Sequence, residues 1–364
     1  MLSLGLTFAE TTLYGNVDQA WNKVTKKFNG VPTKDENTVG FAPVQMGGGV
    51  LGVKGSEDLS NGLKASYTLE IQPAVDSVNG GDIWNRQSFV GLSGGFGAVR
   101  IGKQYSNAFM NTLGMDPGGA TGLAGNNAYC VQLAYSKCSG GSDAPLRQSN
   151  GLQYDLPEML PGLKVGLTVV FGESNTANGG QASGDGNGIS ASYTSGPFYA
   201  GYTFDRVKNT GIGLLTSPGS TVEYTSKTTF EVNKTDYDVA SASTSDQNKL
   251  TTLSASYDLG VAKVSINNTK MSIDSKSVDN TFVAVSVPFG GNANVWASMS
   301  KGSAYRTIVS ANKDHEGFQV GVNYALSKRT VLYAQYGQME LIGVSSATDK
   351  FEQTGSAIGV HHSF

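Results

Sequence analysis

Apolar and polar residues alternate along most of this chain, as they do in β-strands that have two different faces. The alternation is clear over residues 63–70, 163–171, 198–205, 252–259 and 318–324. In the first of these segments, every second residue is Leu, Ala or Tyr, and the residues between them are Lys, Ser, Thr or Glu. Successive strand side chains point to opposite faces, so each segment has one apolar and one polar face.

The connections between these segments alternate between short and long. The short ones are rich in Gly and Pro, as tight hairpins require. This alternation of short and long connections is typical of an outer-membrane barrel, which has short turns at one rim and long loops at the other. The sequence therefore predicts an all-β fold, a transmembrane antiparallel β-barrel of about sixteen strands. The short connections are 57–62, 94–97, 157–162, 195–197, 259–260, 288–291 and 327–329, and the long ones are 25–46, 105–146, 173–187, 207–247 and 304–316.

The composition agrees with a barrel wall. Only 15% of the 364 residues are charged, yet the mean hydropathy is −0.19, and no apolar run approaches the roughly 20 residues of a membrane helix. In a barrel, every second residue faces lipid and its neighbours face water. A soluble β-sandwich or propeller is the alternative, but it does not require so regular a difference between loops. The net charge of −3 and the lack of a basic cluster argue against nucleic acid as a partner.

The first nine residues permit two interpretations. Residues 2–9 are apolar and include small residues, as the end of a secretory signal does, but they lack a basic region and are short for a signal core. We interpret residues 1–9 as a signal-peptide remnant; an ordinary first strand is the alternative. A first strand is expected at about residues 12–24, and residues 10–364 form one barrel domain.

The segment 82–155 organises the rest of the chain. It contains an expected strand at 83–92, a turn at 93–97, a second strand at 98–103 and a third at 147–155. Residues 105–146 between them are rich in Gly, Asn and Ala and show no sustained periodicity. A loop of this length is uncommon in a compact domain, but the lumen of a wide barrel can hold it. We therefore predict a hairpin followed by a lumen-constricting loop.

Five motifs, in the order in which they occur along the chain, resemble those of Gram-negative trimeric porins of the β-proteobacterial branch. The resemblance implies a homotrimer in the outer membrane of a Gram-negative bacterium, in contact with lipid. It also implies a water-filled channel for passive diffusion of small hydrophilic solutes and ions. The final aromatic residue, Phe364, would then be read by the barrel-assembly machinery. The motifs are LGVKGSEDLSNGLKA at 51–65, NRQSFVGL at 85–92, FGAVRIGKQY at 96–105, YALSKRT with LYA at 324–334, and VHHSF at 360–364.

Charged residues at the narrowest point of such a pore act through their field on a passing solute. The resemblance places wall bases at Arg86 and Arg147. Strand alternation puts Arg100 and Lys64 on the lumen face, and Lys103 lies near the base of the long loop. For any one of the arginines, the alternative is a solvated charge at the rim.

The opposing charge is expected on the loop. Asp116 is the only carboxylate between residues 108 and 141, and it falls where the family carries its acidic tip; an ordinary turn Asp before Pro is the alternative. Val50 departs from the family, which usually has an Arg there, and so it weakens the ladder of basic residues.

The two cysteines, Cys130 and Cys138, both lie in the long loop. A protein exported through the periplasm meets an oxidising compartment. We predict a disulfide between them, worth roughly 2–3 kcal/mol in the entropic account. Two free thiols or a metal pair are the alternatives, although no His or further Cys nearby completes a metal set.

Neither catalysis nor a cofactor is expected. The chain has three His residues and lacks the His-Glu-x-x-His and P-loop motifs. An outer-membrane barrel enzyme is therefore a remote alternative. The nearer one is a porin selective for one class of small solute.

Overall fold

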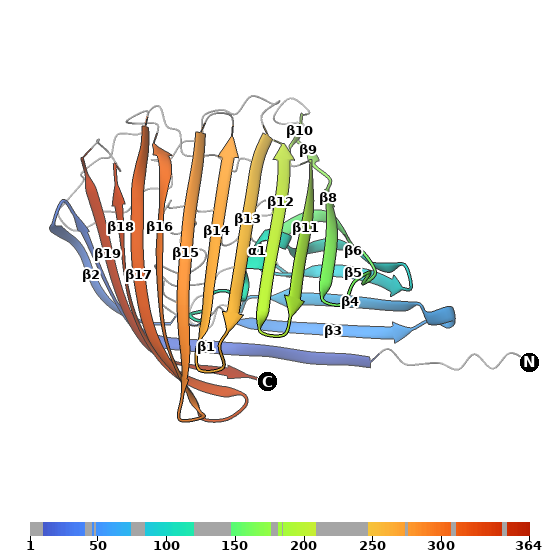
Figure 1. Cartoon of the computed structure of the whole chain (residues 1–364), viewed down its shortest axis with the longest axis horizontal. Coiled ribbons are helices and arrows are strands. Elements are labelled where there is room, and N and C mark those ends of the chain that lie inside the picture. The colour runs from blue at the N-terminus through green and yellow to red at the C-terminus, as the bar shows by residue number, and fades with distance from the viewer. Residues whose placement is uncertain are drawn as a thin grey trace, which may run out of the picture.

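One antiparallel sheet of seventeen strands forms most of the protein. Figure 1 shows many of these strands side by side along the wall. The computed structural model describes residues 10–40, 46, 49–73, 84–119, 147–175, 181–183, 185–208, 247–273, 276–306, 311–343 and 348–364. The elements are β1 (Glu10–Phe28), β2 (Val31–Gly40), β3 (Val50–Asp58), a 3-10 turn (Ser60–Gly62), β4 (Lys64–Ile71), β5 (Ser88–Gly94), β6 (Gly97–Tyr105), α1 (Asn107–Leu113), β7 (Arg147–Asp155), β8 (Leu163–Val170), β9 (Glu173–Asn175), β10 (Gln181–Ser183), β11 (Gly186–Ser195), β12 (Phe198–Lys208), β13 (Gln247–Asp258), β14 (Lys263–Ile273), β15 (Lys276–Phe289), β16 (Ala293–Arg306), β17 (Ala311–Ala325), β18 (Thr330–Ile342) and β19 (Lys350–Ser363).

The first and last strands close the sheet into a barrel. Strand β1 pairs with β19 from Asn16, opposite Ser363, to Phe28, opposite Phe351. The other edge of β1 pairs with β3 over residues 10–16. Sixteen strands therefore form a ring, and the seventeenth, β2, pairs with the later part of β1. The predicted antiparallel barrel is confirmed.

The hairpin of β1 and β2 corrects the expected first strand and first loop. The strand does not end near residue 24 but continues to Phe28, and β2 returns from Val31 within the segment expected to be a loop. The turn between them is Asn29-Gly30, with φ of 49° and 79°. Two positive φ angles define the hairpin turn that Asn-Gly favours, so the sequence contained this signal.

Other boundaries also differ from expectation. The strand expected at 83–92 begins only at Ser88. The loop expected at 173–187 contains the short pair β9 and β10. The loop expected at 304–316 is shorter, because β16 reaches Arg306 and β17 resumes at Ala311.

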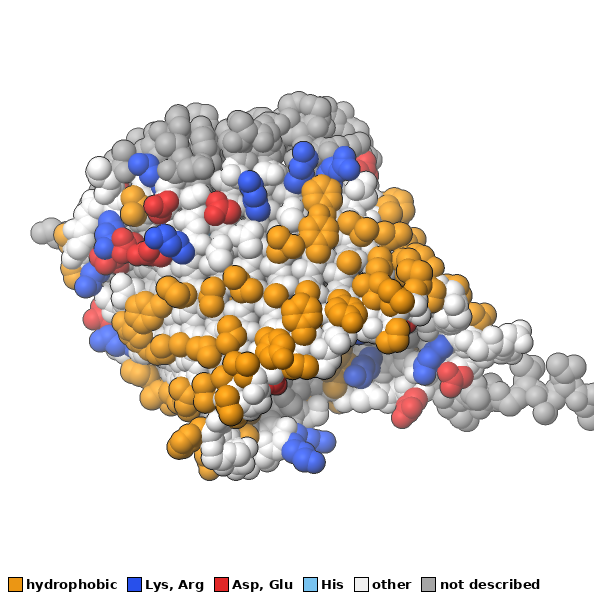
Figure 2. Space-filling view, in the orientation of Figure 1, with side chains coloured by type: hydrophobic (Ala, Val, Ile, Leu, Met, Phe, Trp, Pro, Cys, Tyr) orange, Lys and Arg blue, Asp and Glu red, His pale blue; other side chains and the backbone are white. Residues whose placement is uncertain are grey.

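The two faces of the sheet differ as the alternation predicts. On β14, the outward Val264 and Ile266 are 41% and 47% exposed, whereas the inward Ser265 and Asn267 are 4% and 0% exposed. Figure 2 shows the outward apolar side chains as a band across the face of the wall that is in view. An apolar outer face with a polar interior is what a barrel in lipid requires. Among the described residues, no helix is long and apolar enough to cross a membrane.

Candidate functional site

The side chains of Arg86 and Arg147 meet around one aromatic ring on the polar face of the sheet. The Arg86 Nη2 donates a hydrogen bond to the Tyr105 hydroxyl. The guanidinium carbons of Arg86 and Arg147 lie 5.7 and 5.2 Å from the centre of the Tyr105 ring. Tyr105 ends β6 and lies opposite Arg147, which begins β7. Strand register therefore brings together two positive charges that are 61 positions apart in the sequence.

Among the residues that the structure describes, one carboxylate, that of Glu70, is the acidic partner of this pair. Its Oε2 lies 4.0 Å from the Arg86 Nε and accepts a hydrogen bond of 3.0 Å from the Gln87 Nε2. Its Oε1 accepts one of 2.7 Å from the Tyr14 hydroxyl, and the Lys54 Nζ lies 4.8 Å from the centre of the Tyr14 ring. We call Tyr14, Lys54, Glu70, Arg86, Tyr105 and Arg147 the Tyr105 cluster; its three positive charges and one negative charge leave a net of +2.

The backbone before β5 positions Arg86. Trp84 has a φ of 64°, so the strand cannot extend back through it. The Asn85 Oδ1 accepts a hydrogen bond of 2.8 Å from the Gln72 backbone N–H. The Arg86 N–H donates one of 3.2 Å to the Glu70 carbonyl. This irregular pairing explains why the expected strand starts late, and it holds Arg86 beside Glu70.

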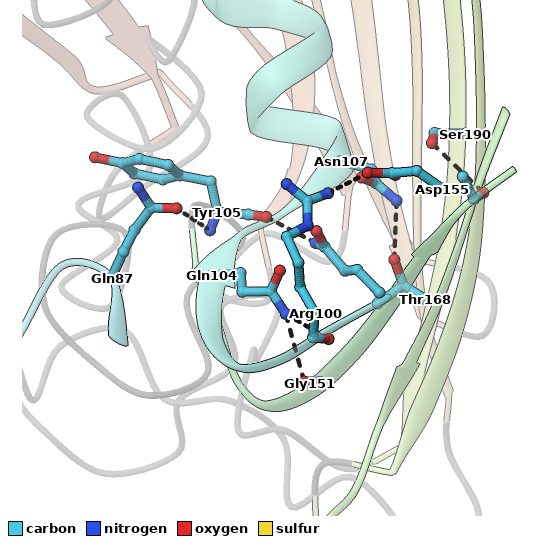
Figure 3. Close-up of polar contacts among 11 residues, drawn as sticks. Gln87, Arg100, Gln104, Tyr105, Asn107, Gly151, Asp155, Thr168 and Ser190 are labelled. Carbon is cyan, nitrogen blue, oxygen red and sulfur yellow. Dashed lines mark hydrogen bonds and ion pairs between the residues drawn. The ribbon is translucent and has the colours of Figure 1, made fainter. Parts of the chain in front are cut away.

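The described part of the long loop contacts polar side chains of the wall on β8 and on the more distant β13. Helix α1 is capped by Ser106, whose hydroxyl accepts a hydrogen bond from the Phe109 N–H. The Asn107 Nδ2 donates one of 2.8 Å to the Thr168 hydroxyl on β8, a contact visible in Figure 3. The Asn111 Nδ2 donates one of 2.9 Å to the Thr252 hydroxyl on β13.

Beyond the helix, the loop reaches β14, β16 and β17. The Lys263 Nζ donates a hydrogen bond of 3.3 Å to the Gly114 carbonyl. Gly118 lies so close to the wall that a Cβ there would be 2.7 Å from the Trp296 ring. Asp116 is buried, and its Oδ1 accepts a hydrogen bond of 2.8 Å from the Gly118 N–H. Residues 114–117 also line a cavity of about 190 Å³ with Lys263 and the polar Ser286 and Asn294.

Comparison with known proteins decides the family. A sequence profile of Gram-negative porins matches residues 5–341. The chain belongs to this family. It is 26% identical to outer membrane porin protein 32 of Delftia acidovorans, over 98% of this chain and 94% of that protein. Two solved structures share its fold: an anion-selective porin from Comamonas acidovorans (TM-score 0.75, 24% identity, 98% and 100% of the two chains), and a trimer form of OmpT, an outer membrane protein of Vibrio cholerae (TM-score 0.64, 17% identity, 98% and 99%).

Family and fold together define the location and the general activity. The chain is a porin of the Gram-negative outer membrane, and its closed barrel forms a channel for passive diffusion. Among the described residues, no group of three or more His, Cys, Asp or Glu side chains could hold a metal ion.

Two of the remaining predicted wall bases of the porin, Arg100 and Lys64, have acidic partners outside the Tyr105 cluster. The Arg100 Nη2 forms an ion pair of 2.7 Å with the Asp155 Oδ2, as Figure 3 shows. Lys103 is skipped in the register of β6 and β7, at a bulge between Gly102 and Gln104. Gly102 permits this bulge, because its φ is 130° and a Cβ there would lie 2.2 Å from the Ser88 carbonyl oxygen.

Lys64 lies near the short turn that joins β3 to β4. Its Nζ is 3.6 Å from the Asp58 Oδ1, and the two side chains are 49% and 80% exposed. In the structure, Arg86 and Arg147 therefore lie together at Tyr105. Arg100 and Lys64 each form an ion pair with a carboxylate outside the cluster. Asp116 lies near β14–β16. Which of these groups acts on a permeating ion stays a prediction.

The other predicted residues of the porin divide into two groups. Cys130 and Cys138 lie outside the described residues, so their disulfide stays a prediction. Phe364 lies at the seam of the barrel, where its N–H donates a hydrogen bond of 3.0 Å to the Gly15 carbonyl. Its recognition by the assembly machinery stays a prediction as well.

Sequence reasoning missed Tyr14, Glu70 and Tyr105, because nothing along the chain distinguishes them from other lumen-facing residues.

Proposed function

We propose that this porin is a general diffusion pore for small hydrophilic solutes and ions, with a charged constriction between the Tyr105 cluster and the long loop. The main support is the Tyr105 cluster itself, in which Arg86 and Arg147 share one ring and outnumber the acidic groups. Loop contacts on the opposite strands, at Asn111 and Lys263, support a loop that crosses the lumen. In a narrow, low-dielectric passage such fixed charges act strongly on an ion.

The net positive charge of the cluster favours anions. A porin of the same fold from Comamonas acidovorans is described as anion-selective, which supports the same preference here. Asp116 near the opposite wall would moderate it, as would Val50 in place of a further base. The pore is a passive one, with no catalytic step.

Reconstitution in a planar bilayer tests the pore. We expect stepwise conductance increases that scale with salt concentration and do not saturate, because a wide, water-filled lumen binds ions weakly. Neutral sugars should enter porin-containing liposomes at rates that fall with solute size alone. Uptake restricted to one chemical class of solute, with saturation, would instead identify a substrate-selective porin. Absence of conductance from correctly folded protein would refute the pore.

We infer a homotrimer assembled through the outward faces of the first and last strands. Register aligns three exposed apolar side chains there: Val39 and Ile358 lie on either side of Trp21. The trimer form of OmpT supports the same assembly for this fold. Trp21→Ala with Ile358→Ala should lower the temperature at which the trimer dissociates, because apolar contact area is lost. Leu253→Ala with Ile266→Ala on the lipid face is the control.

Light scattering of the unheated protein in detergent measures the assembly directly. A mass of three chains after subtraction of the detergent is expected. A monomeric mass would refute the trimer, and equal dissociation temperatures for the two double variants would move the interface away from Trp21.

A further inference from the structure

Helix α1 turns one side toward the barrel wall and an apolar side away from it. The helix packs against β11, β12 and β13, and its buried residues are Ala108, Asn111 and Thr112. Because an α-helix has about 3.6 residues per turn, Phe109, Met110 and Leu113 lie on the opposite side. Met110 is 54% exposed, and Phe109 and Leu113 are half-buried. We call these three residues the apolar face of α1.

Contacts of the buried side fix this orientation of the helix. The Asn111 Nδ2 donates a hydrogen bond to the Thr252 hydroxyl, and the Asn111 Oδ1 accepts one from the Tyr199 hydroxyl. Gly201 on β12 leaves room for this amide, because a Cβ at Gly201 would collide with the Asn111 Oδ1. Rotation of the helix about its axis would break these contacts. The apolar face of α1 is therefore held away from this part of the wall.

The apolar face of α1 adjoins the Tyr105 cluster. The ring centres of Phe109 and Tyr105 are 5.1 Å apart. The guanidinium carbons of Arg86 and Arg147 lie 5.7 and 5.2 Å from the centre of the same Tyr105 ring. An apolar surface therefore continues directly into a surface with a net positive charge.

This combination of surfaces favours one class of solute. The positive charge attracts anions, and an exposed apolar side chain gains free energy when an apolar group covers it. A second charge or a polar chain placed against the apolar face would lose water without a hydrogen bond in return. A solute that fits both surfaces has one anionic group and an apolar remainder.

We propose that the apolar face of α1 gives the pore a preference for small organic monocarboxylates that carry an aromatic ring or a short aliphatic chain. The carboxylate lies on the side of Arg86 and Arg147, and the apolar part lies over Met110, whose sulfur makes favourable contacts with aromatic rings. Binding is weak and transient, so other small solutes still pass. This inference rests on the proposed constriction between the Tyr105 cluster and the long loop.

Block of the chloride current through single pores measures this preference. In KCl, sodium benzoate should halve the current of the wild type at a several-fold lower concentration than sodium gluconate does. Both anions carry one carboxylate, but gluconate carries it on a polar chain, which gains nothing from contact with an apolar surface.

Substitution of Met110 tests the apolar face. Met110→Gln keeps the length of the side chain and its tendency to form a helix but removes an apolar contact. The benzoate concentration for half block should rise about fivefold, since a passing solute covers only part of the side chain, and the gluconate value should stay the same. Met110→Leu should retain the wild-type block. Met159→Gln is the matched control, because Met159 is 63% exposed in the short turn between β7 and β8.

Two results would overturn the proposal: equal block of the wild type by benzoate and gluconate, and unchanged block by benzoate in Met110→Gln. The constriction has a separate test, the reversal potential of the variant in which Arg86 and Arg147 are both replaced by Gln. That variant should be blocked less by both anions. A normal effect of the two arginines together with an unchanged Met110→Gln pore would refute the role of the apolar face and leave the constriction in place.

Discussion

Replacing Arg86 and Arg147 together by Gln should shift the reversal potential of the pore toward cation preference. Both guanidinium groups lie against Tyr105, and their removal leaves Glu70 without a nearby arginine. The Tyr105 cluster then changes from a net charge of +2 to a net charge of zero. Gln keeps much of the side-chain volume and its hydrogen-bonding capacity, so the barrel should fold normally.

The expected size of this shift follows from Coulomb's law. At about 6 Å in water, each charge acts on a passing ion with about 0.7 kcal/mol, and a less polar lumen increases this value. Two charges therefore change the anion-to-cation permeability ratio by at least about tenfold at low salt. Reversal potentials in a KCl gradient measure the ratio. The shift should shrink toward 1 M salt, where the Debye length falls to about 3 Å.

Single variants test the sign of the shift in reversal potential and the location of the constriction. Glu70→Gln and Asp116→Asn each remove a negative charge and should shift the potential toward anions. Lys64→Gln should leave it nearly unchanged, because Lys64 and its partner Asp58 are both well exposed beside a short turn. An open channel with the same potential in the Arg86/Arg147 variant as in the wild type would show that the Tyr105 cluster is not the constriction.

The barrel could be predicted because its signal is local. Alternation with a period of two lies within each strand, and Gly and Pro mark the short turns, so neither requires knowledge of distant residues. Asn29-Gly30 is a local signal of the same kind and marks the turn of the β1–β2 hairpin. The prediction of a loop in this segment was wrong because it did not take the Asn-Gly turn into account. Helix α1 spans only Asn107–Leu113, too short a segment for its periodicity to be recognised.

The composition of the site could be predicted only in part, because it depends on register. Resemblance to the family pointed to Arg86 and Arg147, but their meeting at Tyr105 follows from the pairing of β6 with β7. Glu70 and Tyr14 become neighbours because β3 lies between their two strands. A one-residue change of register would turn such side chains to the other face. Sequence periodicity alone cannot rank them above other polar wall residues.

The Asn111 side chain should hold the long loop against the wall, and its loss should make the open channel unsteady. Asn111 is buried, donates to the Thr252 hydroxyl and accepts a hydrogen bond of 2.6 Å from the Tyr199 hydroxyl. Thr252 in turn shares a hydrogen bond of 2.7 Å with Thr203. Asn111→Ala leaves these hydroxyls without their amide partner, at a cost of about 1–3 kcal/mol for a buried group.

The substitution destabilises the state in which the loop contacts the wall. It does not destabilise the detached state, since water can satisfy the hydroxyls once the loop has moved away. A change of about 1.4 kcal/mol increases the population of the detached state about tenfold. Single-channel recordings of Asn111→Ala should therefore show several times more transitions between conductance levels, at a potential where the wild type is steady. Asn268→Ala is the control, because it removes a hydrogen bond of 2.9 Å to Thr281 within the wall itself. Equal noise in both variants would mean that Asn111 does not hold the loop.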